Sequence, residues 1–524
     1  RQAASIAEQP LFNYADVPYM VDFARKYGSV PFITFPFKAV PFVAQTLYQH
    51  PHRVLRYDRA ADEVNNWLAG TSDEAAREIA ALPEHVRDAM VVRLPFKDGQ
   101  GRPQYIDLSY FMPWAVIQDF AKMAKPSEDV GAGMGFREGM LTPPAQVLID
   151  AIRYNITAIR AHVGPGVSLF AAVKANAYGH GAVPVARAAL ESGASRLLVA
   201  RVEEGLELRR AGITAPIHIL GYNLPAEAPL IAEHDLSPSI TTVEGAQALS
   251  AAAAALGRRV RAHVKVDTVM GRYGLLPDEV APFVRRVSAL PGLEVEGIFT
   301  HFAVADGAAE GKAFTEQQFS QFRRVREALT RAGLDIPLWH AANSAAALDL
   351  PRTHLDAVRI GLAMYGLYPS EHVSRRVPLK PALSLHSPVA RVRTLPPGSS
   401  LGYGRTFVAA RPTRVALVPI GYGDGFHRLL SNRGHVLING QRAPIAGRVS
   451  MDQITVDATD LGAVAQDDAV VLLGEQGGER ITAEEIAAHA ETINYEVVTS
   501  LTARVTRVFV RGGRVVQVVR LAGD

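Results

Sequence analysis

The apolar run at residues 170–174 ends on a lysine and leads directly into a polar, glycine-rich turn. The run reads Phe-Ala-Ala-Val-Lys, and residues 175–181 continue as Ala-Asn-Ala-Tyr-Gly-His-Gly. A lysine at a strand end can form a Schiff base with a carbonyl cofactor if burial lowers its pKa enough to leave the amine neutral. Pyridoxal phosphate is the candidate cofactor. The segment alone fits equally well a solvated Lys174 beside a phosphate-binding turn.

Eight short apolar segments after residue 145 have the composition of β-strands, and helix-like segments such as 243–256 and 317–332 lie between them. The strand-like segments are residues 167–174, 197–200, 217–221, 237–240, 261–267, 295–301, 338–343 and 357–360. Eight strands that alternate with helices predict an α/β fold, a closed parallel (β/α)8 barrel.

Polar side chains recur at or just past the carboxyl ends of these segments, which is the face where such barrels build their active sites. The residues are Lys174, Lys265 with Asp267, His301, Asn343 with Ser344, and Arg359. This convergence favours the catalytic interpretation of Lys174 over the solvated one.

Two further parts flank the barrel. Residues 1–140 have the pattern of an α+β segment of unknown role, with a capping box at 71–74 and a turn at 97–99 between short strands. Proline and glycine concentrate between residues 125 and 145, which predicts a connection and a boundary near 140. Alternating strands with glycine turns at 439–440 and 512–513 predict a mainly β C-terminal domain. We therefore expect an extension at 1–140, the barrel at 141–378 and a β domain at 379–524.

The composition excludes several classes of partner. Lys and Arg number 55 against 52 Asp and Glu, and a net charge of +3 is too small to indicate a nucleic-acid or anionic-membrane partner. No apolar stretch approaches the roughly 20 residues of a membrane helix. The chain has no cysteine, which excludes disulfides, thiolate metal sites and a cysteine nucleophile, and fits a cytoplasmic location.

Nine segments between about residue 145 and the end of the chain together resemble alanine racemase, a pyridoxal-phosphate enzyme family built from a β/α barrel and a β domain. They include Ala-Val-Lys-Ala-Asn-Ala-Tyr-Gly-His-Gly at 172–181 and Gly-Tyr-Gly-Arg-Thr at 402–406. The others are residues 265–272, 300–302, 342–344, 358–362, 420–425, 448–452 and 493–496. Together these motifs are highly specific.

The resemblance implies two catalytic bases. Lys174 would hold pyridoxal 5'-phosphate and act as one base, and Tyr403 of a partner subunit would act as the other. Racemisation removes a proton from one face of a planar intermediate and returns one to the opposite face, so two bases are the simplest arrangement. By itself Tyr403 fits an aromatic residue in a glycine-flanked turn, and the accompanying motifs favour the catalytic role.

The resemblance also implies a set of cofactor contacts. Arg359 would hydrogen-bond the pyridine nitrogen, whose protonation its charge disfavours, and His301 would link Arg359 to Tyr403. By itself His301 fits a core histidine bonded to the backbone, and Asn343 with Ser344 fits a helix cap, which is compatible with anion binding. The phosphate side would consist of Tyr178, Asn343, Ser344, the amides of Gly361 and Leu362, and Tyr495.

The amino-acid substrate would meet a separate set of groups. Arg272 would contact its carboxylate together with the backbone amide of Met451 from the partner subunit, while Tyr422 and Asp452 would line the entry. Lys265 matches a lysine that is carbamylated in many family members, and equally fits a barrel lysine paired with an acid. The resemblance implies no metal. Val269, Gly402 and Thr506 stand where the family usually has glycine, serine and proline.

We therefore expect a homodimeric enzyme that interconverts L-alanine and D-alanine and supplies D-alanine for peptidoglycan. A racemase that also accepts serine or other amino acids stays open. A decarboxylase of the same plan would place a glutamate at the pyridine nitrogen and use a catalytic cysteine, whereas this chain has Arg359 and no cysteine. Single-barrel proteins that bind the same cofactor lack the β domain. An interaction protein that acts through residues 1–140 is the third alternative.

Overall fold

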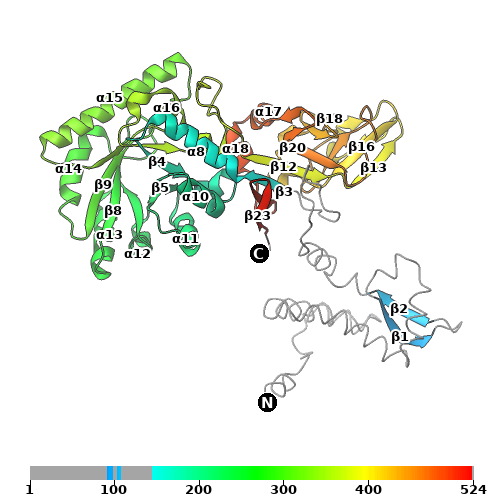
Figure 1. Cartoon of the computed structure of the whole chain (residues 1–524), viewed down its shortest axis with the longest axis horizontal. Helices are drawn as coiled ribbons and strands as arrows, with labels where there is room; N and C mark the ends of the chain where they lie inside the picture. Colours follow the sequence, from blue (N-terminus) through cyan, green and yellow to red (C-terminus); the bar gives the residue numbers. More distant parts are fainter. Residues whose placement is uncertain (1–90, 98–102, 108–143, 522–524) are drawn as a thin grey trace. The chain divides into compact units, whose positions relative to one another are not determined.

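The computed structural model describes residues 91–97, 103–107 and 144–521 (Figure 1). The chain forms two compact units, residues 1–131 and 132–524. In the first unit, β1 (Val91–Lys97) pairs antiparallel with β2 (Pro103–Asp107). These two strands flank the turn predicted after Lys97. Asp98 and Gly99 of that turn, the capping box at 71–74 and the connection up to residue 143 lie outside the described residues.

Eight parallel strands of the second unit close into a barrel with the order β10-β11-β4-β5-β6-β7-β8-β9. They are β4 (Ser168–Ala172), β5 (Arg196–Val199), β6 (Ile217–Ile219), β7 (Leu236–Ile240), β8 (Val260–Lys265), β9 (Leu293–Phe299), β10 (Leu338–His340) and β11 (Ala357–Ile360). Each strand lies within one of the eight predicted segments or begins one or two residues before it. The predicted (β/α)8 barrel is confirmed.

Helices cover the outside of the barrel (Figure 1). They are α8 (Ile149–Val163), α10 (Ala182–Glu191), α11 (Val202–Arg210), α12 (Ala228–Glu233), α13 (Val243–Ala255), α14 (Pro277–Val287), α15 (Ala309–Arg331) and α16 (Ser344–Asp349), with short 3-10 turns η3 (Pro225–Glu227) and η4 (Pro351–Thr353). Helix α15 begins eight residues before the predicted start at 317. Residues 309–316 contain Gly311 and show no apolar repeat, so the pattern gave no signal there.

The C-terminal part is mainly β, as predicted. One large sheet has the order β18-β17-β20-β12-β3-β22-β23, and β21 adds to β20. Its strands are β3 (Pro144–Leu148), β12 (Leu383–Pro388), β17 (His435–Ile438), β18 (Gln441–Pro444), β20 (Ala469–Gln476), β21 (Glu479–Ile481), β22 (Thr506–Arg511) and β23 (Arg514–Val519). Smaller sheets contain β13 (Arg391–Leu395), β16 (Thr413–Val418) and β19 (Ile454–Asp457), and β14 (Ser400–Leu401) with β15 (Phe407–Val408). Two helices, α17 (Ala483–His489) and α18 (Asn494–Thr499), complete this part together with the turn η8 (Arg428–Leu430).

Both predicted hairpin turns are present. Asn439 and Gly440 connect β17 to β18 with φ of 50° and 76°, and Gly512 and Gly513 connect β22 to β23 with φ of 57° and 73°. Two consecutive residues with positive φ are the requirement of a type I′ turn.

Strand β3 differs from the sequence interpretation, which extended the glycine- and proline-rich connection to residue 145 and began the barrel at 141. Residues 144–148 pair antiparallel with β12 and parallel with β22. Pro144 is the first residue of the strand, where the missing N–H is tolerated. The large sheet therefore combines β3, which precedes the barrel in sequence, with strands that follow the barrel. Helix α8 begins directly after β3 and leads into the barrel.

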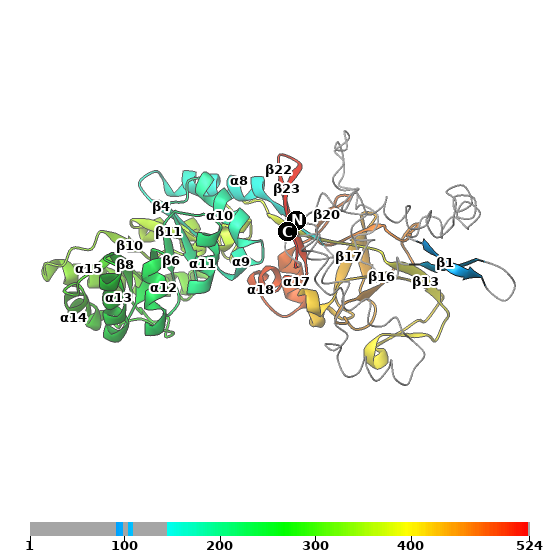
Figure 2. The ribbon, with the colours of Figure 1, turned by 90° about the horizontal axis from the view of Figure 1, so that it is seen from below.

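The turn after β4 packs against the β-rich part of the same unit. Short helix α9 (Lys174–Tyr178) lies beside α18 (Figure 2). A Cβ at Gly179 would lie 1.9 Å from the Val498 carbonyl oxygen, and one at Gly181 would lie 2.5 Å from the Phe509 ring. Only glycine allows so close an approach, so these two positions bring the Lys174 turn against helix α18 and strand β22.

Among the described residues, none of the helices combines the length and apolar character required to cross a membrane.

Candidate active site

Lys174 opens a turn of unusual backbone conformation at the end of β4. Residues 175–178 all have positive φ, between 52° and 53°, and none of them is glycine. A left-handed conformation costs about 1–2 kcal/mol per such residue. Glu204 accepts a hydrogen bond from the Ala175 amide at 2.7 Å, and the Asn176 side chain accepts one from the Ala182 amide at 2.8 Å. Backbone strain of this kind persists only where neighbouring contacts hold it, and it is typical of functional sites.

The Lys174 amine is half-buried and lies among charged groups. Burial and the nearby Arg272 and Arg359 guanidinium groups lower the pKa of Lys174, while the Glu204 carboxylate opposes them. A lowered pKa increases the fraction of neutral amine, the form that reacts with a carbonyl or accepts a proton. The amine therefore has the environment that the sequence interpretation required of it.

Arg359 is a buried hydrogen-bond hub in β11, with 5% of its surface exposed. Its Nη1 donates to His340 Nδ1 at 2.9 Å and to the His340 carbonyl at 3.0 Å. Its Nη2 donates to the carbonyls of Thr300 at 2.7 Å and Ala341 at 2.8 Å, and lies 3.3 Å from His301 Nδ1. Burial lowers the pKa of Arg359 to about 9, which leaves the group charged at neutral pH. The contact expected between Arg359 and His301 is present.

His301 is held neutral by its surroundings. Burial and the positive charges of Arg359, Lys265, Lys174 and Arg272 lower the pKa of His301 well below its ordinary value. These five side chains therefore share one region at the carboxyl end of the barrel, and a neutral imidazole there can both donate and accept a hydrogen bond.

Lys265 is the last residue of β8 and only 2% exposed. Its Nζ donates to the Val266 carbonyl at 3.3 Å and lies 5.1 Å above the centre of the Phe299 ring. Burial, Arg359 and Arg272 lower the pKa of Lys265 to about 7, and Asp267 opposes them. No ion pair of Lys265 occurs in the described part of the chain, because the Asp267 carboxylate accepts from the amides of Met270 and Gly271.

The residues of the expected phosphate side converge. The Tyr178 ring lies 6.3 Å from the Tyr495 ring, which α18 contributes, and a Cβ at Gly361 would lie 2.7 Å from the Tyr178 hydroxyl. The Ser344 hydroxyl accepts from the Gly361 amide at 2.9 Å, and Leu362 begins the turn η5 (Leu362–Tyr365). Burial raises the pKa of Tyr178 to about 12 and keeps its hydroxyl protonated.

Asn343 has a local structural role in this site. Its side chain accepts from the Ala346 amide at 3.1 Å and caps the amino end of α16. The helix-cap alternative for this residue is therefore confirmed, and a cofactor contact of Asn343 stays a prediction.

Arg272 is exposed on the loop after β8, in which Val269 has a φ of 84°. This is a conformation that glycine adopts readily and that a β-branched residue rarely adopts. The family preference for glycine at this position, noted from the sequence, therefore has a backbone explanation. Gly402, where serine is frequent in the family, has a φ of 66° and suits its position.

The remaining predicted residues form an exposed group on the β-rich part. Tyr403 starts the turn η6 (Tyr403–Arg405) and is 71% exposed, and Met451 is 52% exposed. Tyr422, in η7 (Tyr422–Asp424), donates its amide to the Ser450 carbonyl at 3.0 Å, and Asp452 accepts from Arg504 at 2.6 Å. Among the described residues, no hydrogen bond or ion pair joins this group to Lys174.

Sequence reasoning missed a polar layer inside the barrel and the contact of Glu204 with the Lys174 turn. The layer consists of Arg196, His218, His263, Glu296 and His340, which come from five different strands. Polar residues that interrupt apolar strands, such as His218 between two isoleucines, were a signal that could have located it.

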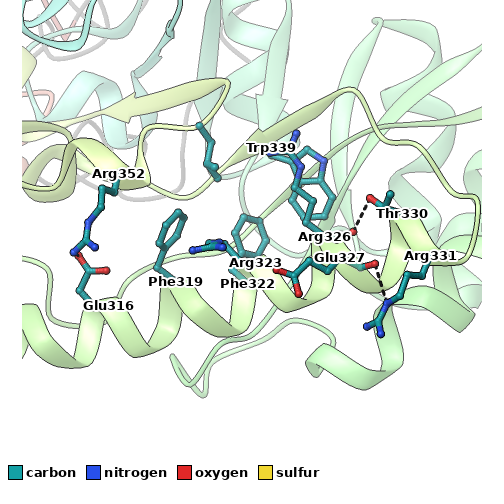
Figure 3. Close-up of a pocket in the computed structure, with 11 residues that line it drawn as sticks. Glu316, Phe319, Phe322, Arg323, Arg326, Glu327, Thr330, Arg331, Trp339 and Arg352 are labelled. Carbon is teal, nitrogen blue, oxygen red and sulfur yellow. Dashed lines mark hydrogen bonds and ion pairs between the residues drawn. The ribbon is translucent and has the colours of Figure 1, made fainter.

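One cavity lies away from these residues. It measures ≈ 890 Å³ and runs along α15, where Phe322, Arg326 and Trp339 line it (Figure 3). Arg352 and Leu355, which precede β11 at its amino end, also line this cavity, and it contains none of the predicted site residues.

The fold and the cluster at the carboxyl ends define a barrel enzyme with a β-rich companion region. Family models match residues 147–369 as the N-terminal domain of alanine racemase and residues 382–509 as its C-terminal domain. The alanine racemase of Desulfosudis oleivorans is 46% identical over 378 residues, which cover 70% of this chain and 96% of that protein. That of Halothermothrix orenii is 42% identical over 363 residues, 69% of this chain and 95% of that protein.

A solved structure shows the same relationship. The alanine racemase from Bacillus anthracis with bound L-Ala-P is similar with a TM-score of 0.69 and 40% identity, over 73% of this chain and 98% of that chain. The chain therefore belongs to the alanine racemase family, as its motifs predicted.

Proposed function

We propose that this protein interconverts L-alanine and D-alanine with pyridoxal 5'-phosphate as its cofactor. The observation that carries the proposal is the half-buried Lys174 amine, whose pKa burial, Arg272 and Arg359 lower at the carboxyl end of the barrel. Family membership supports the choice of alanine as the substrate. Acceptance of serine, use of D-alanine in peptidoglycan and a cytoplasmic location stay predictions.

The described residues fit the cofactor. The absence of a Cβ at Gly361 leaves space beside the Tyr178 hydroxyl, and the hydroxyls of Ser344 and Tyr495 belong to the same side of the site. Hydroxyl groups and backbone amides are suitable donors for a phosphate. Lys174 would tether the cofactor at the opposite side, and the buried guanidinium of Arg359 would donate to its ring nitrogen. When bound, the cofactor supplies a conjugated ring that withdraws electrons from the substrate.

The protein's own residues would then bind the substrate and move one proton. Arg272 is exposed on its loop and suits the planar substrate carboxylate. Lys174, as a neutral amine, would exchange the proton at the substrate Cα on one face. The Tyr403 hydroxyl would exchange it on the other face. Arg359 remains a hydrogen-bond donor throughout because it stays charged at neutral pH.

We further propose a homodimer in which each site takes Tyr403 and Met451 from the partner copy. The support is that both residues are largely exposed in one chain, at 71% and 52%, while the barrel residues of the site are buried or half-buried. Tyr422 and Asp452 belong to the same exposed group and would line the entry to the site of the other copy.

A carbamate on Lys265 is the third part of the proposal. The buried amine has a pKa of about 7, so a large fraction of it is neutral, and its nitrogen can form a bond to the carbon of carbon dioxide while one amine proton is released to solvent. The resulting anion would lie near Arg272 and Arg359 and would neutralise part of their charge. Intact-protein mass spectrometry under gentle conditions tests for this adduct.

Chiral analysis of the product tests the central proposal. Purified protein is incubated with L-alanine or D-alanine, with and without added pyridoxal 5'-phosphate, and with L-serine as a second substrate. We expect both alanine enantiomers to reach the same equal mixture, and added cofactor to restore any activity lost on dialysis. Unchanged alanine in the presence of excess cofactor contradicts the proposal.

A further inference from the structure

A layer of polar side chains fills the barrel interior next to Arg359. Barrel interiors are usually packed with branched aliphatic residues. Here Arg196 of β5, His263 of β8, Glu296 of β9 and His340 of β10 each lie within hydrogen-bond distance of at least one other of these residues, and the three residues other than Glu296 are at most 6% exposed. So many buried polar groups are costly unless each one has a partner.

The side chains form one continuous chain of hydrogen bonds. His340 Nδ1 lies 2.9 Å from Arg359 Nη1, and His340 Nε2 lies 3.0 Å from His263 Nδ1. His263 Nε2 lies 3.1 Å from Glu296 Oε2. Arg196 holds both Glu296 oxygens, at 2.9 Å and 2.6 Å. Each imidazole thus uses both of its ring nitrogens within the chain.

The Arg359 and Glu296 ends of the chain favour the same position for the proton of each histidine. A guanidinium can only donate, so His340 Nδ1 must be the acceptor and the proton of neutral His340 must be on Nε2. That proton is donated to His263 Nδ1, and the His263 proton must then be on Nε2, where it is donated to Glu296. A carboxylate can only accept, so the Glu296 end requires the same direction. Arg196 Nη1 also lies 3.1 Å from His263 Nε2, but it donates to Glu296 Oε2 at 2.9 Å, and in this arrangement its contact with His263 is not a hydrogen bond.

The charges of the layer agree with this arrangement. Burial lowers the pKa of His340 well below its ordinary value and that of His263 to about 4, with Arg359 and Arg196 contributing. Burial alone would raise the pKa of Glu296, but hydrogen bonds from His263 and Arg196 outweigh it and hold that pKa well below its usual range. Glu296 is therefore an anion, and both histidines are neutral.

We propose that Glu296, acting through His263 and His340, is a positioning residue that fixes the orientation of Arg359. The proposal rests on the proposed function, in which Arg359 donates to the cofactor. Glu296 directs the lone pair of His340 toward Nη1 of Arg359. With the opposite tautomer, His340 would present an N–H to that guanidinium, and the two donors would repel each other. The Nη2 group, 3.3 Å from His301, would then move from its place.

A metal ion is the competing use of this layer. One ring nitrogen each of His218, His263 and His340 lie within 4.8 Å of one another. His263 and His340, however, already use their nitrogens in the chain, and Arg196 and Arg359 place two positive charges directly against them. His218 donates its Nδ1 proton to the Ser237 carbonyl at 2.9 Å and stacks on His263, and its buried Nε2 is the one ring nitrogen of the three histidines that has no hydrogen-bond partner in the described part of the chain. The hydrogen-bond chain is therefore the favoured interpretation.

The matched variants are Glu296→Gln and Glu294→Gln. Both residues are on β9, but the Glu294 side chain is 42% exposed against 17% for Glu296 and pairs with exposed Arg259 at 3.4 Å, so Glu294 serves as the control. An amide offers one acceptor oxygen where Glu296 offers two, so Arg196 and His263 must compete for it. Glu296→Asp keeps the charge and tests rescue.

The first measurement is the histidine tautomer by ¹⁵N NMR of the cofactor-loaded protein labelled at histidine. We expect neutral His340 and His263 with Nε2 protons in the wild type and the Glu294 variant, and loss of this pattern in Glu296→Gln. A wild-type His340 that carries its proton on Nδ1, or that is charged, overturns the proposal even if the Glu296 variant does not fold. Signals shifted by a bound metal overturn it too.

The second measurement separates this proposal from the proposed function. If the wild type racemises alanine, we expect Glu296→Gln to lower kcat by about tenfold with a smaller change in KM, as removal of outer hydrogen-bond partners does at metal sites. The absorption spectrum of the bound cofactor should change in the same variant, and Glu296→Asp should restore part of both. Unchanged kcat and spectrum overturn the positioning role. An inactive wild type refutes the proposed function, while the tautomer measurement still tests the hydrogen-bond chain.

Discussion

The two halves of the candidate site differ in how complete they are within one chain. On the barrel side Lys265 and Arg359 are 2% and 5% exposed, and hydrogen bonds or neighbouring charges fix each group. On the β-rich side Tyr403 and Met451 are 71% and 52% exposed. The difference indicates that a single chain preorganises the proposed cofactor side and leaves the proposed second base, Tyr403, exposed on its surface. The following experiments test this division.

Subunit mixing should give the largest effect. We expect Lys174→Ala to lower activity by about 10⁴-fold or more and Tyr403→Phe by about 10²–10⁴-fold, because each removes one acid–base group. If sites are shared, random exchange of the two variants should restore about one quarter of wild-type activity, since half of the dimers then carry one intact site. Mixtures no more active than the separate variants would show that each chain supplies its own tyrosine.

Hydrogen exchange should distinguish the two bases. Net conversion cannot do so, because the enantiomers have equal free energy and both directions must change together. We expect Tyr403→Phe to suppress exchange of the α-proton with deuterated water from one enantiomer far more than from the other. Mass spectrometry of the recovered substrate measures it. Equal suppression for both enantiomers would refute the assignment of Tyr403 as a one-sided base.

The buried Lys265 should impose a pH dependence on stability. Its pKa falls from 10.5 to about 7 on folding, so the folded state binds the proton less readily than the unfolded state. The resulting destabilisation, on the order of 5 kcal/mol, is fully present below pH 7 and disappears as pH rises toward 10.5. We expect Lys265→Met to raise Tm most at low pH and least near pH 10, measured by calorimetry. An increase of the same size at every pH would indicate a modified, non-titrating lysine, and exposed Met451→Leu is the control.

Relief of backbone strain in the Arg272 loop should have a smaller effect. Val269→Gly removes a β-branched residue from a φ of 84° and should raise the free energy of unfolding by about 1 kcal/mol, despite the greater freedom of glycine in the unfolded chain. Denaturant titration measures the change. A loss of stability would mean that contacts of the valine side chain outweigh the strain.

The smallest effect should come from the exposed entry group. Asp452 pairs with Arg504 at 2.6 Å, with side chains that are 56% and 42% exposed. Exposed ion pairs contribute about 0–1 kcal/mol, so Asp452→Asn should leave stability almost unchanged. Any change should instead be seen in KM for alanine. A large loss of stability would show that this group is part of the folded core.

Local sequence patterns predicted most of the described strands and turns. Features that depend on contacts between residues far apart in sequence could not be predicted in this way. The eight barrel strands and both glycine turns follow from apolar runs and turn residues close together in sequence. Strand β3 could not be predicted because its partners, β12 and β22, lie more than two hundred residues further along the chain. The contact between Glu296 and His263 likewise depends on a register shift between β8 and β9 that no single strand encodes.

The site itself shows the same limit. Lys174 and His301 were recognisable because they follow apolar strands, and Arg359 because it interrupts one. The support of Arg359 by His340 was not, since it requires side chains from neighbouring strands to point inward at the same depth.

The four residues that follow Lys174 twist in the sense opposite to an ordinary helix, and their own chemistry does not favour that twist. Cut out as a peptide, this stretch would relax into another shape. In the protein, contacts with other segments hold this backbone conformation. Glu204 accepts a hydrogen bond from the Ala175 amide, and the backbone around Val498 packs closely against Gly179. A substitution in the segment around Val498 would therefore disturb the Lys174 amine while leaving the strands of the barrel intact.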